Sequence, residues 1–118
     1  RLMLALTIRI DARSAVPSLV LVEVGASVGG ATSSSIGERL HQVAQGVQVL
    51  VVTHSPPVAA RGDSHLRISK LVRQSLTETS AEILSPEHRR EEIARMLAGD
   101  TITDAARAAA DSLLEADL

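Results

Sequence analysis

Two apolar runs flanking an amphipathic segment constrain the fold of this chain more than any other feature. Residues 19–24 read Leu-Val-Leu-Val-Glu-Val, and residues 47–53 read Val-Gln-Val-Leu-Val-Val-Thr. Such short, nearly continuous apolar runs are typical of strands that are buried on both faces. Residues 32–44 lie between them and have helical periodicity. One face of that expected helix carries Ile36, Leu40, Val43 and Ala44. The order strand, helix, strand predicts a βαβ unit with parallel pairing and a right-handed crossover.

Further elements extend this unit on both sides. Residues 1–8 are apolar-periodic and lack a start Met and an N-cap, so we expect a helix that is cut inside its first turns. Gly46 and Gly99 are expected to close helices. The remaining expected elements are a helical turn at 56–60, a half-exposed strand at 64–71, a strand near 76–84, a helix at 86–97 with Ile93, Met96 and Leu97 inward, and a helix at 103–115. Without repeats or linkers, the 118 residues predict one α/β domain of two or three layers.

Composition limits the core and the partners. The chain has no Phe, Trp, Tyr or Cys, so its core must be aliphatic and it has no disulfides. A net charge of −2 provides no field that would attract nucleic acid or an anionic membrane, so we expect any link to DNA to be indirect. No apolar run approaches the roughly 18 to 20 residues of a membrane span. We therefore expect a cytoplasmic protein without a membrane partner.

An acidic residue and a histidine end the two predicted parallel strands. Glu23 lies at the end of the first apolar run, and His54 directly follows the second. Because the carboxyl ends of adjacent parallel strands form the crevice where α/β proteins bind ligands, we expect both side chains at one sheet edge. They should be close enough to address one ligand through at most a water or a phosphate. The other histidines fit no metal-ligand spacing and are expected at the surface: His41, His65 and His88.

Several segments resemble one family in the correct order. Residues 19–24 resemble the Walker B strand of SMC-like ABC ATPases, and residues 51–60 (Val-Val-Thr-His-Ser-Pro-Pro-Val-Ala-Ala) resemble the switch-histidine segment of the RecN family. Residues 1–6 are similar to the helix after the ABC signature, and residues 90–99 and 102–106 are similar to the RecN C-terminal tail. The resemblance implies the C-terminal lobe of an ABC ATPase head, with a parallel βαβ core and C-terminal helices.

The resemblance also implies a role and partners. The family acts in bacterial DNA double-strand-break repair and recombination, in the cytoplasm and at the nucleoid. Its intact members use ATP and Mg²⁺, pair this lobe with the N-terminal lobe of the same head, and form homodimers. Glu23 matches the general base that polarises the attacking water, and His54 matches the residue that contacts the γ-phosphate. Phosphoryl transfer needs such groups because it depends on positioned water and on stabilisation of spreading charge.

Several positions depart from the family. Val22 replaces the Asp that supports Mg²⁺, and a valine offers no oxygen ligand, so we expect no metal site. Gly25 and Ser27 occupy nucleotide-binding positions of the loop that crosses to the partner's ATP site, where the family has Asp and Gly. Pro57 stands where the family usually has Gln. The chain contains neither a G-x-x-x-x-G-K-[ST] phosphate loop nor the signature Ser-Gly-Gly, so we expect the isolated chain to be inactive.

Two alternatives compete with this interpretation. Residues 25–29 satisfy G-x-S-x-G after an apolar run, which would make Ser27 a serine-hydrolase nucleophile with Asp63 and either His65 or His88. An α/β-hydrolase sheet is normally much longer than 118 residues can build. Because the three other histidines are expected at the surface and His54 at another strand end, we expect no histidine within about 2.6 to 3.2 Å of the Ser27 hydroxyl. The other alternative is a non-catalytic interaction module that self-associates through an uncovered apolar sheet.

Overall fold

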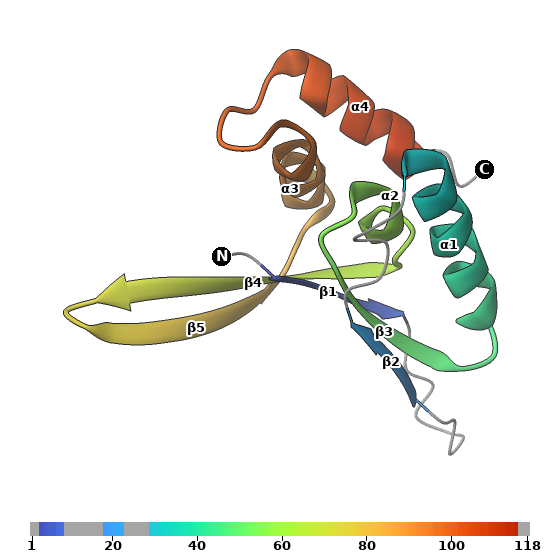
Figure 1. The fold of residues 1–118 in the computed structure, drawn as a ribbon, viewed down its shortest axis with the longest axis horizontal. Helices are drawn as coiled ribbons and strands as arrows, with labels where there is room; N and C mark the ends of the chain where they lie inside the picture. The colour runs from blue at the N-terminus through green and yellow to red at the C-terminus, as the bar shows by residue number, and fades with distance from the viewer. Residues whose placement is uncertain (1–2, 9–17, 23–28, 116–118) are drawn as a thin grey trace.

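The computed structural model describes residues 3–8, 18–22 and 29–115 (Figure 1). The strands are β1 (Met3–Ile8), β2 (Ser18–Val22), β3 (Gln48–Thr53), β4 (Ser64–Arg73) and β5 (Leu76–Ile83). The helices are α1 (Gly30–Val43), α2 (Pro56–Ala59), α3 (Pro86–Ala98) and α4 (Asp104–Glu115). The mixed α/β class that the sequence predicts is confirmed.

The strands form one sheet in the order β2-β3-β1-β4-β5. Strands β2 and β3 are adjacent and parallel, with Val22 opposite Val52, and α1 connects them along the chain. All other neighbouring strands are antiparallel. The predicted parallel pairing of the two apolar runs is therefore confirmed within the described residues.

The N-terminal segment forms a strand, and the expectation of a helix at residues 1–8 is wrong. Met3–Ile8 lies between β3 and β4 and pairs antiparallel with both. Periodicity alone cannot separate a short apolar helix from a buried strand. Strand pairing selects the extended conformation of β1, because the two neighbouring strands supply backbone hydrogen-bonding partners on both sides of it.

The described helices lie on one face of the sheet (Figure 1). Along β3 the fully buried side chains alternate with half-buried ones, so Val49, Val51 and Thr53 face the helices. The aliphatic core that they join is completed by small and branched residues of the helices, mainly Val58, Ala59, Ile93, Ala94, Ala106 and Ala110. Because the chain has no aromatic residues, small aliphatic side chains that pack closely together fill this core.

Strand β2 is not buried on both faces, contrary to the prediction from its apolar run. Leu19, Val20 and Val22 are 41%, 57% and 61% exposed. Two features of the architecture explain this. Strand β2 lies at an edge of the sheet, and the described helices pack on the face that carries Val49 and Val51. An apolar run shows which side chains of a strand could be buried. The position of the strand in the sheet determines which of those side chains are buried.

Helix boundaries follow capping residues. Ser85 begins α3, since its Oγ accepts a hydrogen bond from the His88 N–H at 3.3 Å, and Pro86 occupies the first turn. Gly99 ends α3 with φ +79°, which confirms its predicted role. Helix α1, by contrast, ends at Val43 with Ala44 as its C-cap, so Gly46 lies beyond the cap. Among the residues predicted to face inward, Leu97 is 42% exposed.

Helices α3 and α4 are held together by ion pairs as well as by the core. The Arg90 guanidinium donates two hydrogen bonds to the Asp111 carboxylate, at 2.6 and 2.8 Å. This hydrogen bonding holds the pKa of Asp111 below its usual range. Arg107 similarly donates to Glu91 at 2.8 Å. In the described part of the chain, no helix is both long and apolar enough to cross a membrane.

Candidate functional site

The carboxyl ends of β2 and β3 form the candidate site. Val22, the last residue of β2, pairs with Val52, and His54 follows the end of β3. His54 is exposed, while its neighbours Thr53 and Ser55 are buried. Of these three consecutive residues, His54 is therefore the one whose side chain faces solvent.

Three predicted site residues lie outside the described residues: Glu23, Gly25 and Ser27. The distance from Glu23 to His54 therefore stays a prediction, as does the expectation that no histidine contacts the Ser27 hydroxyl. Val22, the residue directly before Glu23, is described, and it lies opposite a residue that precedes His54 by two positions.

A side-chain hydrogen bond closes the turn around His54. The Ser55 N–H donates to Thr53 Oγ1 at 3.0 Å. Helix α2 then begins with Pro56 and Pro57, neither of which has an N–H. Thr53, which makes this contact next to His54, is not among the site residues that the sequence predicts. The available signal was a hydroxyl residue at the last strand position before His-Ser-Pro-Pro.

Helix α1 supports this turn from one side by close contact with α2 and the residues that follow it. An ideal Cβ on Gly37 would lie 2.8 Å from Arg61 Cγ and 3.1 Å from the Pro57 carbonyl oxygen. Arg61 is itself buried, and its guanidinium pairs with Glu38 of α1 at 3.4 Å. Gly37 therefore allows α1 to approach the segment that follows His54.

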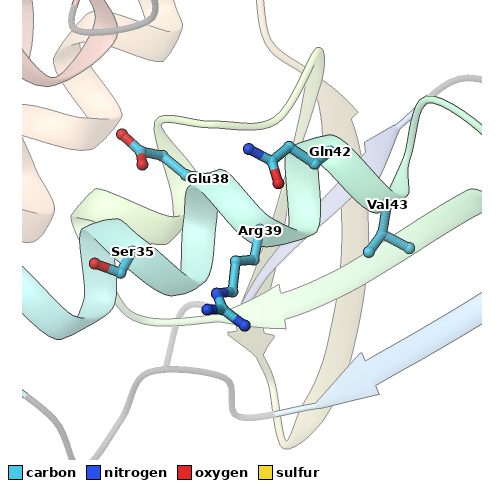
Figure 2. Close-up of a pocket in the computed structure, with 5 residues that line it drawn as sticks. All are labelled: Ser35, Glu38, Arg39, Gln42 and Val43. Atoms are coloured by element: carbon cyan, nitrogen blue, oxygen red, sulfur yellow. The ribbon is translucent and has the colours of Figure 1, made fainter.

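A hollow of about 550 Å³ on α1 lies apart from this turn. Figure 2 shows its described lining residues, all of them from α1: Ser35, Glu38, Arg39, Gln42 and Val43. Their side chains spread from the helix, with Glu38 and Gln42 on one side and Arg39 and Val43 on the other (Figure 2). None of these described residues is a predicted site residue.

His65 is buried, and its predicted surface position is wrong. It is 1% exposed, and neither ring nitrogen has a hydrogen-bond partner among the described residues. Burial, together with the nearby Arg89 and Arg67, lowers the pKa of His65 from 6.5 to about 4, although Glu92 opposes this shift. The neutral imidazole is therefore the stable form inside the fold. Of the other two histidines, His88 is exposed and His41 is half-buried, with Nδ1 3.2 Å from the Arg61 carbonyl oxygen.

Strand β4 explains the burial of His65. Arg67 pairs with Glu92 of α3 at 3.7 Å, which places the odd-numbered residues of β4 on the helix-covered face. Glu92 is also buried and accepts a hydrogen bond from Arg95 at 2.6 Å. The apolar Leu66 and Ile68 consequently lie on the face without helices.

The described residues contain no group of three or more His, Cys, Asp or Glu side chains that could hold a metal ion. Val22 is 61% exposed and presents only methyl groups. Of the hydrolase candidates, Ser27 lies outside the described residues, His65 makes no hydrogen bond, and Asp63 Oδ1 lies 4.0 Å from His41 Nδ1.

Comparisons with known proteins agree on one kind of relative. The chain is 38% identical to the DNA repair protein RecN of Rickettsia felis over 114 residues, and 42% identical to that of Streptomyces coelicolor over 115 residues. It is 38% identical to that of Bacillus subtilis over 115 residues. These alignments cover 97 to 98% of the chain but only 20 to 21% of each relative. The chain thus spans about a fifth of the length of these proteins. No protein-family model matches it.

Proposed function

The chain belongs to the RecN family, and on that premise we propose that it forms the C-terminal lobe of a RecN-type ATPase head that acts in DNA repair. The observation that carries this proposal is the parallel pairing of β2 with β3, with Val22 opposite Val52 and an exposed His54 directly after β3. This arrangement suits two strand-end residues that act on one ligand, because adjacent parallel strands end at the same edge of a sheet.

In the proposed head, Glu23 polarises the water that attacks the γ-phosphate of ATP, and His54 contacts that phosphate. The remainder of the head, including an N-terminal lobe with a phosphate loop, belongs to other parts of a RecN-type protein, since these 118 residues contain no G-x-x-x-x-G-K-[ST] sequence. Homodimer formation, the indirect link to DNA and a place in the cytoplasm at the nucleoid belong to the same proposal.

The described residues do not fit a resident Mg²⁺ ion. Magnesium prefers oxygen ligands, whereas Val22 offers methyl groups, and the described residues hold no acidic cluster. We therefore assign no catalytic step to a metal held by this lobe. Losing one preorganised electrostatic group typically slows an enzyme about 10²- to 10³-fold, and this chain lacks several such groups. The isolated chain is accordingly proposed to be inactive.

The first experiment measures phosphate release from Mg²⁺-ATP by the chain and by Val22→Asp, each with a Glu23→Gln control. We expect no turnover above the controls in either background. Val22→Asp restores one carboxylate to an otherwise incomplete site. Turnover that disappears in Glu23→Gln would mean that the lobe holds a complete site, and the proposal of an inactive lobe would be wrong.

The second experiment places this chain in a complete head. The chain, carrying Val22→Asp, replaces the corresponding segment of Streptomyces coelicolor RecN, to which it is 42% identical. We expect this chimera to hydrolyse ATP and to lose about 10²-fold or more of its rate in Glu23→Gln or His54→Ala. The proposed roles of Glu23 and His54 would be contradicted if the chimera folds and binds ATP but its turnover is unchanged by both substitutions.

The comparisons do not favour the alternatives. The relatives are DNA repair proteins by name, and His65, one of the two histidines that the hydrolase interpretation needs as a base, makes no hydrogen bond. An assay with a short acyl ester separates these functions, because only a Ser27 nucleophile would produce turnover that is lost in Ser27→Ala.

A further inference from the structure

We propose that Thr53 is a positioning residue for His54, and that its hydroxyl holds the turn that presents the imidazole at the carboxyl edge of the sheet. The inference rests on the proposed function, since it gives Thr53 a part in the same phosphate site. Thr53 does not touch the nucleotide in this proposal. It acts through the backbone on both sides of His54.

The turn is held by a hydrogen bond that solvent cannot easily replace. Thr53 is fully buried at the end of β3, and its Oγ1 accepts the Ser55 N–H at 3.0 Å. Ser55 is also buried, at 8% exposure. Donor and acceptor are two residues apart, so the bond closes a small ring across His54. A buried N–H that loses its acceptor is costly, which makes an open form of this turn unfavourable.

The adjacent sequence limits the backbone donors near the turn. Pro56 and Pro57 have no N–H, so His54 and Ser55 carry the only backbone N–H groups between the end of β3 and Val58. The Ser55 side chain makes no capping hydrogen bond. Pro56 also favours an extended conformation at Ser55, which has φ −85° and ψ 115°. The prolines limit the path of the chain after His54, and the Thr53 hydroxyl connects that path to β3.

The rate of phosphoryl transfer depends on the exact position of a side chain that contacts the phosphate in the transition state. A displacement of about 1 Å in a reacting constellation can reduce a rate about 10²-fold. Helix α1 restricts movement of α2 because Gly37 already approaches Pro57 and Arg61 closely. His54 thus stands on a short segment that is fixed at its start by Thr53 and at its end by α2.

The test uses the chimera that carries Val22→Asp, with Thr53→Val as the variant and Thr53→Ser as its matched control. Valine keeps the shape of threonine but has no acceptor, whereas serine keeps the hydroxyl. We expect Thr53→Val to lower kcat about 10- to 100-fold with little change in the KM for ATP. We expect Thr53→Ser to keep most of the turnover. The same chimera with His54→Ala shows whether His54 acts in the reaction at all.

A second measurement covers the case in which Thr53→Val does not fold. Amide hydrogen exchange of Ser55 is followed by NMR in the 118-residue chain and in Thr53→Ser. We expect a protected Ser55 amide in both, because the hydroxyl is present in both. A Ser55 amide that exchanges as freely as one in an unfolded chain would overturn the inference.

The outcomes separate the two proposals. If His54→Ala does not change turnover, the proposed function fails and the role of Thr53 fails with it. If His54→Ala slows turnover but Thr53→Val does not, the proposed function stands and the inference is overturned. If Thr53→Ser is as slow as Thr53→Val, the hydroxyl is not the cause, and the inference is again overturned.

Discussion

At the residue scale, the burial of His65 shows how one side chain can make stability depend on pH. The pKa of His65 is lowered to about 4 in the fold, while an unfolded histidine has a pKa of 6.5. Between these values the unfolded chain binds a proton that the folded chain does not bind. The folded state therefore loses stability as the pH falls from about 6.5 to about 4, and this contribution is constant above and below that range.

We predict that this contribution is removed in His65→Gln. A shift from 6.5 to about 4 corresponds to roughly 3 kcal/mol in the free energy of unfolding. Urea unfolding at several pH values measures it in the chain and in His65→Gln. The slope of stability against pH between 6.5 and 4 should decrease in His65→Gln. Equal slopes in the two proteins would show that His65 binds a proton as easily in the folded chain as in the unfolded one.

At the element scale, the packing of α1 against α2 depends on a glycine. We predict that Gly37→Ala lowers the free energy of unfolding by about 1 to 3 kcal/mol, because the new methyl group meets buried Arg61 and a backbone oxygen. Alanine is the better helix former, so propensity alone would predict the opposite sign. Thermal or urea unfolding decides between the two.

The matched control for this prediction is Gly46→Ala. A Cβ at position 46 meets nothing within 4 Å, and Gly46 is not among the described residues with positive φ. We expect this variant to be neutral or stabilised by up to about 1 kcal/mol. If Gly37→Ala is stabilised to the same degree, α1 and α2 can separate without loss.

Most element types could be predicted from the sequence because their signals are local. The helix at Pro86–Ala98 follows from Ser85, Pro86 and Gly99, and α4 follows from an alanine-rich run. The parallel pair β2 and β3 follows from two apolar runs around a helix. Met3–Ile8 could not be predicted in this way, because six apolar and small residues fit a helix or a strand equally well, and only pairing with β3 and β4 selects the strand.

At the scale of the whole molecule, helices on one face of the sheet give its two faces different roles. Val51 lies against the helices and is 1% exposed, whereas Val20 lies on the opposite face and is 57% exposed. The second face is nevertheless apolar, since Val20 and Val22 share it with Leu50 and Val52 through the β2–β3 register. In the proposed head, further parts of a RecN-type protein lie next to this lobe.

We predict that the same substitution has different effects on the two faces. Val51→Thr places a hydroxyl in the core and should lower the free energy of unfolding by about 1 to 3 kcal/mol. Val20→Thr should stay within about 0.5 kcal/mol, because that side chain already contacts solvent. Urea unfolding of the isolated chain measures both variants. A large loss in Val20→Thr would show that the face without helices is covered in solution.

Four properties follow from the amino-acid sequence: the α/β class, the parallel pairing of two apolar runs, the position of His54 after a strand and the similarity to RecN proteins. These properties depend on periodicity, capping residues and ordered motifs, which can be identified along the chain. Which side chains are buried depends instead on how the elements pack in three dimensions. Along β4 the apolar Leu66 and Ile68 predict the covered face, yet helix α3 packs on the opposite face and buries His65 and Glu92. Burial depends on which elements meet in space, and the residues of a single strand do not contain that information.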